Sequence, residues 1–160
     1  MSVAVLALGS NLGDRLAALR AACGFVGARF APLATAGVYC TPPAFYANQP
    51  DFYNSALAVS ADVSALELLD FCKDIERGMG RKPSFRNAPR PIDIDIIFYE
   101  GRDCAGARLT IPHVGWRERG FVVAPLLDLL DAGALAGAYF AAAAAYLSSQ
   151  KRAYKKICNL

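Results

Sequence analysis

Two aspartates separated by one residue stand in the most apolar strand-like segment of the 160-residue chain, Ile92 to Tyr99. Side chains alternate between the two faces of a strand, so Asp93 and Asp95 share one face and the flanking isoleucines share the other. Two carboxylates about 6–7 Å apart repel each other unless a cation lies between them. Carboxylate oxygens suit Mg²⁺, which completes its shell with water and phosphate oxygens. We therefore predict a metal site at Asp93 and Asp95; the alternative is the solvated face of an edge strand.

Basic residues gather immediately before this segment and again after it. The first group lies within ten positions that contain no acid, and the second lies near the single histidine; the groups are Arg81, Lys82, Arg86 and Arg90, and Arg108, Arg117 and Arg119 around His113. Guanidinium groups match phosphate oxygens and neutralise charge that develops in phosphoryl transfer. Because the net charge is only +3, such local clusters indicate a site for a compact polyanion such as a nucleoside triphosphate. Each cluster by itself is also compatible with a solvated surface, and a lone histidine is more often structural.

Other classes of protein find little support in the sequence. The turn Gly9 to Gly13 lacks the Lys-Ser/Thr ending of a Walker loop and the third glycine of a dinucleotide fingerprint. The five cysteines form no CxxC pair, which is typical of reduced intracellular thiols. No secretion signal is recognised, and the alanine-rich run 133–147 is short for a membrane span. We expect a cytoplasmic protein with no membrane or nucleic-acid partner.

The pattern of apolar residues predicts the elements that must position these groups. Strands are expected over 3–8, 34–39, 52–59 and 92–99, and helices over 15–28, 64–77, 116–130 and 137–150. Asp14 is expected to cap the first helix, and Ser64 with Glu67 forms a capping-box signature for the second. The order predicts an α+β fold, a ferredoxin-like βαββαβ antiparallel sheet with helices on one face and additional C-terminal helices. One domain is expected over 1–160.

Six short motifs, taken together in this order, resemble those of the 6-hydroxymethyl-7,8-dihydropterin pyrophosphokinase family of folate biosynthesis. The resemblance covers about residues 3–130 and leaves 131–160 as a helical tail with no assignment. The motifs are Leu8-Gly9-Ser10-Asn11-Leu12-Gly13-Asp14, Tyr39-Cys40-Thr41-Pro42-Pro43, Gln49-Pro50-Asp51-Phe52-Tyr53-Asn54, Glu76 with Gly80-Arg81, Pro89-Arg90-Pro91-Ile92-Asp93-Ile94-Asp95, and Ile111-Pro112-His113 with Arg119-Gly120-Phe121.

The resemblance implies a monomeric enzyme that uses ATP as co-substrate, binds two Mg²⁺ ions at Asp93 and Asp95, and releases AMP. Phe52 and Phe121 would enclose the pterin ring. The residues implied at the edge of the pterin are Thr41, Pro42, Pro43, Ala44 and Asn54. Those implied around the nucleotide are Glu76, Arg81, Arg86, Arg90, Ile96, Arg108, Thr110, His113 and Arg119. The catalytic roles fall to Arg81, Arg90 and Asp95, with Asp95 as the candidate general base.

The sequence departs from the family pattern at three places, one of which is the tail beyond about Asp131. Asn87-Ala88 replaces the usual Trp-Gly before Pro-Arg, so Phe85 is the remaining aromatic in that loop, and Val114 replaces the aromatic that often follows the site histidine. Two other functions are compatible with parts of the sequence. A DxD nucleotide-sugar transferase would also use paired aspartates, and an RNA-binding module could share the framework through Arg119-Gly120-Phe121-Val122.

Overall fold

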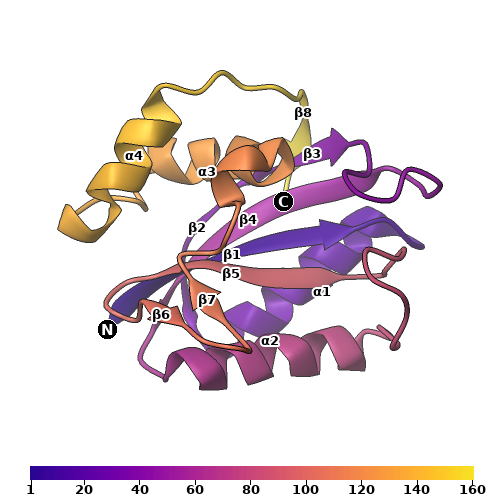
Figure 1. The fold of residues 1–160 in the computed structure, drawn as a ribbon, viewed down its shortest axis with the longest axis horizontal. Coiled ribbons are helices and arrows are strands. Elements are labelled where there is room, and N and C mark those ends of the chain that lie inside the picture. The colour runs from indigo at the N-terminus through magenta and orange to yellow at the C-terminus, as the bar shows by residue number, and fades with distance from the viewer.

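A central antiparallel sheet runs through the molecule and carries helices on both faces (Figure 1). The computed structural model describes all 160 residues. Its elements are β1 (Ser2–Ser10), α1 (Arg15–Gly27), β2 (Ala31–Thr35), β3 (Gly37–Thr41), β4 (Phe52–Ala61), α2 (Ala65–Gly78), β5 (Asp93–Tyr99), β6 (Cys104–Ala105), β7 (Thr110–Ile111), η1 (Trp116–Glu118), α3 (Gly120–Asp131), η2 (Ala138–Phe140), α4 (Ala141–Ser148) and β8 (Lys156–Asn159).

The strand order confirms the ferredoxin-like arrangement. The main sheet runs β5-β1-β4-β3-β8, with β2 pairing beside β3 on β4, and β1 pairs antiparallel with both β4 and β5. β6 and β7 form a separate two-stranded ribbon. Because β1 is central and covered on both faces, it is apolar from Val3 to Leu8 instead of alternating with polar residues.

Two hydrophobic cores lie on opposite faces of the sheet. On one face, α1 and α2 pack through Leu19 and Leu68 against Leu6 of β1. On the other, α3 and α4 pack through Leu126 and Leu147 in a core that also holds residues of β1, β4 and β5. The predicted C-terminal helices therefore cover the face that α1 and α2 leave free, and the domain has three layers (Figure 1).

Both predicted helix caps are confirmed. The Asp14 carboxylate accepts a hydrogen bond from the backbone N–H of Ala17 at 3.0 Å and so begins α1. Ser64 Oγ accepts from the N–H of Glu67 at 3.2 Å, and the Glu67 carboxylate accepts from the N–H of Ser64 at 2.8 Å. This reciprocal capping box fixes the start of α2 by satisfying two N–H groups that the helix itself leaves unpaired.

Two predicted elements are divided in the structure. The strand expected over 34–39 is two strands, β2 and β3, and both pair with β4. The two strands meet at Ala36, whose N–H donates to the carbonyl of Ala56 at 2.9 Å. The helix expected from 116 is a short turn followed by α3, because Arg119 is extended, at φ −103° and ψ 93°. This break puts Arg119 at the N-cap of α3 and Phe121 in its first turn.

The prediction of a helical tail over 131–160 is wrong for its last residues. α4 ends at Ser148, and the chain then crosses over α3 and adds β8 to the sheet by pairing antiparallel with β3 (Figure 1). The strand satisfies backbone groups that β3 would otherwise expose at the sheet edge. β8 has only four residues, and its two apolar side chains are adjacent, so it shows no periodic pattern. The sequence pattern therefore could not indicate this strand. No helix has the length and apolar character needed to span a bilayer.

Candidate active site

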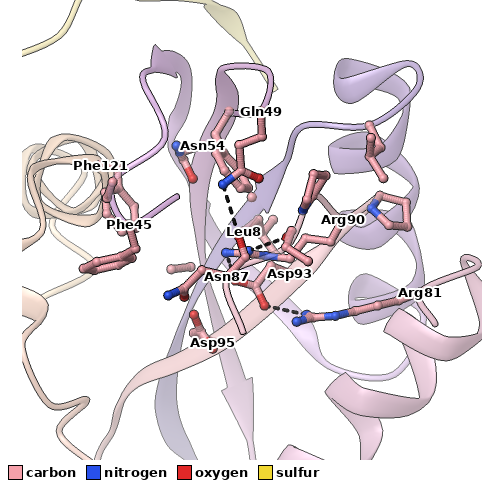
Figure 2. A pocket seen from close by; sticks show the side chains of 18 of the residues that line it. Leu8, Phe45, Gln49, Asn54, Arg81, Asn87, Arg90, Asp93, Asp95 and Phe121 are labelled. Atoms are coloured by element: carbon pink, nitrogen blue, oxygen red, sulfur yellow. Dashed lines mark hydrogen bonds and ion pairs between the residues drawn. The ribbon is translucent and has the colours of Figure 1, made fainter. Parts of the chain in front are cut away.

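A cavity of about 780 Å³ opens where strands β1, β3, β4 and β5 meet two long loops and the start of α3 (Figure 2). The loops are residues 42–51 and residues 79–92. A second cavity of about 290 Å³ lies between β5, α2 and the segment 106–114. Asp95 and His113 line both cavities, so they stand at the junction between them.

Asp93 and Asp95 lie on one face of β5, as the alternation predicts, but their surroundings differ. Asp93 forms ion pairs with Arg81 Nη1 at 2.6 Å and with Arg90 Nη2 at 3.3 Å. Burial alone would raise the pKa of Asp93, but the charges of Arg90 and Arg81 hold it below its ordinary value. Asp95 has no such partner, and burial together with the charge of Asp93 raises its pKa to about 7.

The donor set at this point fits a hard divalent cation. The unpartnered Asp95 carboxylate lies beside a second carboxylate, and the energetic cost of that arrangement is relieved when a cation binds between them. No cluster of three or more potential protein ligands is present. Two carboxylates with the remaining positions open to water and phosphate oxygens is the set that Mg²⁺ usually takes beside a nucleotide, whereas Zn²⁺ sites use more nitrogen and sulfur.

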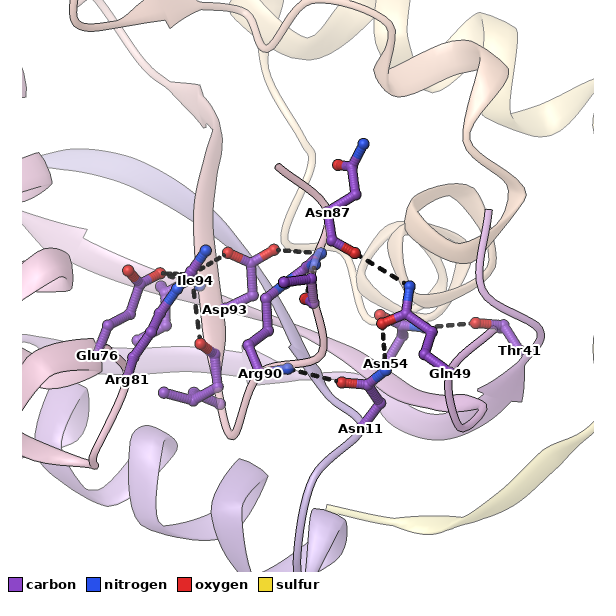
Figure 3. Close-up of polar contacts among 12 residues, drawn as sticks. Asn11, Thr41, Gln49, Asn54, Glu76, Arg81, Asn87, Arg90, Asp93 and Ile94 are labelled. Atoms are coloured by element: carbon purple, nitrogen blue, oxygen red, sulfur yellow. Dashed lines mark hydrogen bonds and ion pairs between the residues drawn. The ribbon is translucent and has the colours of Figure 1, made fainter. Parts of the chain in front are cut away.

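Glu76 lies beneath the site and does not line either cavity. Its carboxylate is 3% exposed and accepts a hydrogen bond from the backbone N–H of Ile94 at 2.7 Å (Figure 3). It also forms ion pairs with Lys73 and, at 3.1 Å, with Arg81. Glu76 therefore anchors α2 to β5 and orients Arg81 toward Asp93.

Asn11 ties three loops together, a function that its sequence motif did not indicate. The residue is 2% exposed; its side-chain oxygen accepts from the N–H of Arg90 at 2.9 Å, and its amide nitrogen donates to Gln49 Oε1 at 2.8 Å (Figure 3). Gln49 Nε2 in turn donates to the carbonyl of Asn87 at 3.1 Å. Asn11 and Gln49 both belong to the sequence motifs described above. Only the folded chain shows that their side chains link the loop 42–51 to the loop 79–92.

The residues implied at the pterin edge lie together at one end of the large cavity. Asn54 Nδ2 donates to Thr41 Oγ1 at 2.6 Å, and both side chains are nearly buried. Pro42 and Ala44 line the cavity and Pro43 does not.

The two aromatic residues expected to enclose the pterin differ in exposure to the cavity. Phe52 is 8% exposed, and the Arg90 guanidinium covers its ring at 4.8 Å from the centroid. Phe121 projects from α3 beside Phe45, an aromatic residue that sequence reasoning missed (Figure 2). The Arg119 guanidinium lies near both of these rings, 5.2 Å from the centroid of Phe45 and 6.0 Å from that of Phe121.

The residues implied around the nucleotide divide between the two cavities. The large cavity contains Arg81, Arg86, Arg90, His113 and Arg119, and the smaller one contains Ile96, Arg108, Thr110 and His113. Lys73, which sequence reasoning missed, adds a cation to the smaller cavity. Its spacing of three residues from Glu76 on α2 was an available signal.

His113 keeps an unsatisfied ring nitrogen at the junction. Its Nδ1 is buried without a hydrogen-bond partner, while its backbone N–H donates to the carbonyl of Ile97 at 2.9 Å. Burial and the nearby charge of Arg119 lower the pKa of His113, so its imidazole is neutral at pH 7. Arg90 Nε is likewise buried and unpartnered.

The departures from the family pattern occupy well-defined positions. Asn87 adopts φ 60°, a left-handed conformation that asparagine tolerates and most side chains do not. Ala88 is buried at 5% exposure. Phe85 packs edge-on against Tyr46 with ring centroids 5.2 Å apart, so this aromatic pair joins the two loops. Val114 is 69% exposed beside the smaller cavity.

Comparisons with known proteins identify the family of this chain. The model of the family described as 7,8-dihydro-6-hydroxymethylpterin-pyrophosphokinase (HPPK) matches residues 5–131. The chain is 39% identical to a 2-amino-4-hydroxy-6-hydroxymethyldihydropteridine pyrophosphokinase of Methylorubrum extorquens, covering 81% of this chain and 83% of the relative. It is 35% identical to the protein of the same name from Bacillus subtilis, with 80% and 78% covered.

Longer proteins contain the same region. A mitochondrial folate synthesis bifunctional protein of Pisum sativum is 43% identical over 79% of this chain, and the chain spans 25% of its length. The chain spans 20% of the length of a folic acid synthesis protein of Dictyostelium discoideum. An HPPK-DHPS crystal structure of Plasmodium falciparum superposes with a TM-score of 0.63 at 19% identity, covering 79% of this chain and 40% of that one, which shows the shared fold. The chain belongs to the 7,8-dihydro-6-hydroxymethylpterin-pyrophosphokinase family.

Proposed function

We propose that the protein transfers a pyrophosphoryl group from ATP to the hydroxymethyl group of 6-hydroxymethyl-7,8-dihydropterin and releases AMP. The observation that carries this proposal is the meeting of two cavities at Asp95 and His113. One cavity has aromatic and amide groups suited to a flat heterocycle, and cations line both. A transferred group held at the junction would touch both substrates, as a direct transfer requires.

The pterin would occupy the end of the large cavity near Asn54. An amide and a hydroxyl in a nearly buried pair can donate and accept hydrogen bonds along the edge of the heterocycle. Phe121 and Phe45 are accessible to stack on a ring, whereas Phe52 would first need Arg90 to move from its face. The aromatic walls therefore fit a flat bicyclic substrate better than a sugar.

The phosphates would lie among the guanidinium groups of Arg81, Arg90 and Arg119. In the substrate-free protein Arg81 and Arg90 neutralise Asp93, so both can exchange that carboxylate for phosphate oxygens. Arg90 Nε and His113 Nδ1 are unsatisfied polar atoms of residues that line the cavity, and a phosphate oxygen or bound water would satisfy them. Arg86 lies on the loop 79–92, which can bring it to the same phosphates.

Asp93 and Asp95 would hold two Mg²⁺ ions, which when bound neutralise phosphate charge. The hydroxymethyl oxygen of the pterin attacks the β-phosphorus, the bond from that phosphorus to the oxygen of the α-phosphate breaks, and AMP leaves with the electron pair. Asp95 is the proposed acceptor of the hydroxyl proton, because its carboxylate forms no ion pair within the protein and its pKa is raised to about 7. The remaining contribution of the protein is positioning and charge stabilisation.

The test is incubation of the purified protein with ATP, Mg²⁺ and the reduced pterin, with AMP measured by chromatography. We expect AMP and pterin pyrophosphate in equal amounts, and none when pterin or Mg²⁺ is omitted. AMP formation that does not depend on pterin would contradict the proposal. Neither the nucleotide-sugar transferase nor the RNA-binding alternative is supported by the family match. A monomer in the cytoplasm stays a prediction.

A further inference from the structure

The last twelve residues, 149–160, form a strap that lies outside the part of the chain matched by the family model. The strap leaves the end of α4, passes over α3 and ends as β8 beside β3 (Figure 1). It therefore connects α3, the helix that carries Phe121, to β3, the strand that ends at Thr41, and both of these residues line the large cavity.

Asp128 of α3 is the anchor of the strap. Its carboxylate accepts from the Gly37 N–H at 2.8 Å and from the Tyr39 hydroxyl at 2.9 Å, both on β3. From the strap, Arg152 Nη1 donates to it at 2.5 Å and Lys156 Nζ lies at 3.3 Å. With its side chain only 9% exposed, this carboxylate forms a well-satisfied network joining α3, β3 and the strap.

Tyr154 of the strap packs on the first residue of α3. A Cβ atom at Gly120 would lie 3.1 Å from Tyr154 Cε2 and 3.3 Å from its hydroxyl oxygen, which is tighter than nine in ten real contacts of a Cβ atom. The backbone φ angle of Gly120 is not positive, so its conformation does not require a glycine at this position. The missing side chain instead leaves room for the Tyr154 ring.

The first turn of α3 needs outside support. Its N-cap residue, Arg119, makes no side-chain capping hydrogen bond, so the turn lacks the local stabilisation found at the starts of α1 and α2. This is the turn that carries Phe121. A helix start without a cap frays unless tertiary packing holds it.

We propose that Tyr154 is a positioning residue for the pterin site, holding the first turn of α3 so that Phe121 keeps its place in the wall of the large cavity. The inference rests on the proposed function, because it assigns the strap to the pterin end of that site. Loss of the ring would leave the turn free to shift, and a shift of about 1 Å in a positioning group can cost up to about a hundredfold in rate or affinity.

The experiment compares Tyr154→Ala with Tyr154→Phe, which keeps the ring, in the full-length chain. We expect Tyr154→Ala to raise KM for the pterin about tenfold, equivalent to about 1.4 kcal/mol, while kcat and KM for ATP change less than about twofold. Tyr154→Phe should restore the wild-type KM. Lys155→Ala, at the exposed neighbouring position, is the matched control and should behave as wild type.

A second variant approaches the same contact from α3. Gly120→Ala places a methyl group against the Tyr154 ring and should also raise KM for the pterin. Equal loss of pterin affinity, ATP affinity and kcat in Tyr154→Ala, with a lowered Tm, would show a general structural role and overturn the proposal. An unchanged KM in Tyr154→Ala would overturn it as well.

Amide hydrogen exchange separates this inference from the proposed function. The N–H groups of Val122 and Val123 donate to the Arg119 carbonyl at 2.9 and 3.0 Å. Tyr154→Ala should speed their exchange by at least about tenfold without affecting amides of β1, because only the first turn of α3 is released. If the wild-type protein forms no AMP, the proposed function fails whatever the exchange result; unchanged exchange at these two amides would overturn the positioning role by itself.

Discussion

At the scale of single residues, two identical side chains two positions apart have different properties. Asp93 is held by two arginines, whereas Asp95 faces the junction of the cavities without an ion-pair partner. The pKa of Asp93 is lowered and that of Asp95 is raised to about 7. The pair therefore combines a neutralised carboxylate with one that gains most from a bound cation.

Replacement of either aspartate by asparagine separates these roles. We expect Asp93→Asn and Asp95→Asn each to lower kcat by at least about a hundredfold, since a catalytic metal ligand contributes several kcal/mol and each 1.36 kcal/mol is about tenfold in rate. Asp93→Asn should also lower Tm, because Arg90 loses its ion-pair partner and Arg81 keeps only Glu76, while Asp95→Asn should not. The measurements are AMP formation at saturating substrates and thermal unfolding.

Asp74→Asn serves as the control, because Asp74 pairs with Arg77 on the exposed face of α2 and lines neither cavity. It should leave kcat and Tm near their wild-type values. Near-normal turnover of Asp95→Asn at ordinary Mg²⁺ would contradict the metal assignment.

Substitution of the aromatic residues of the cavity should affect pterin binding and ATP binding differently. Phe121→Ala should weaken pterin binding by at least about 1 kcal/mol, a typical value for one aromatic pair, and leave ATP affinity unchanged. Phe52→Ala is expected to weaken pterin binding too, but it also removes a nearly buried ring beneath Arg90 and should destabilise the fold. Calorimetric titration with pterin and with an ATP analogue measures both affinities. Equal loss of the two affinities in Phe121→Ala would identify Phe121 as a core aromatic.

At the scale of elements, the loop between α2 and β5 is fixed at both ends and exposed in the middle. Arg81 at its start pairs with Glu76 and Asp93, and Arg90 at its end is held through its backbone by Asn11. The intervening part, from Lys82 to Arg86, is exposed. Closure over the substrates would therefore move the middle of the loop more than its ends.

The conformation of Asn87 explains why an aromatic does not suit this position as it now stands. At φ 60° a tryptophan would be strained, so restoring the family residue by itself would cost backbone energy before any pterin contact is gained. The Phe85–Tyr46 pair supplies an aromatic contact between the loops instead.

Arg90→Ala tests the function of the loop end. We expect kcat to fall by at least about tenfold with a much smaller change in affinity for an ATP analogue, because the Arg90 side chain is already engaged with Asp93 and Phe52 before substrates bind. Its phosphate contact then forms mainly in the closed state. Single-turnover rate and equilibrium affinity are the two measurements.

Arg86→Ala is the matched comparison, since Arg86 is exposed on the same loop and has no ion pair in the structure. It should lower kcat less than Arg90→Ala does. A collapse of ATP affinity in Arg90→Ala with an unchanged saturated rate would mean that Arg90 binds ATP in the ground state.

At the scale of the whole molecule, the three layers place the site where the central strands of the sheet approach α3. The carboxylates come from β5, the amide and hydroxyl groups from β4 and β3, and an aromatic wall from α3. The relative position of β3 and α3 depends on Asp128 and the strap. The stability of this connection is therefore expected to affect the geometry of the site.

The Asp128 network predicts a dependence on pH. Burial alone would raise the pKa of Asp128, but hydrogen bonds from Gly37, Tyr39 and Arg152 lower it. A lowered pKa in the folded state stabilises the protein above the unfolded value of about 3.9, and this stabilisation is lost as pH falls through the folded pKa. Asp128→Asn should therefore lower Tm at pH 7, and the difference from wild type should shrink below about pH 4.

Thermal unfolding of both proteins between pH 3 and 7 provides the measurement. Asp131→Asn is the control, because Asp131 pairs with the same arginine but is largely exposed and should contribute little. A Tm difference that stays constant down to pH 3 would show that the Asp128 charge is not what stabilises the connection.

The sequence by itself determined the features that depend on neighbours along the chain. Alternation along β5 places Asp93 and Asp95 on one face, and the caps at Asp14 and Ser64 depend on residues three positions away. These features follow from local backbone geometry, which a short stretch of residues specifies. The strand order followed from the sequence of elements, since few topologies connect them without crossing.

Tertiary structure alone decided which groups meet across long separations. Arg81 could have paired with either aspartate, and the amides of Asn11 and Gln49 give no sequence signal of their contact. The strap pairs with β3 more than one hundred residues earlier in the chain. Such contacts depend on how the layers pack, because distance in space between these residues is set by the whole fold and not by their spacing in the chain.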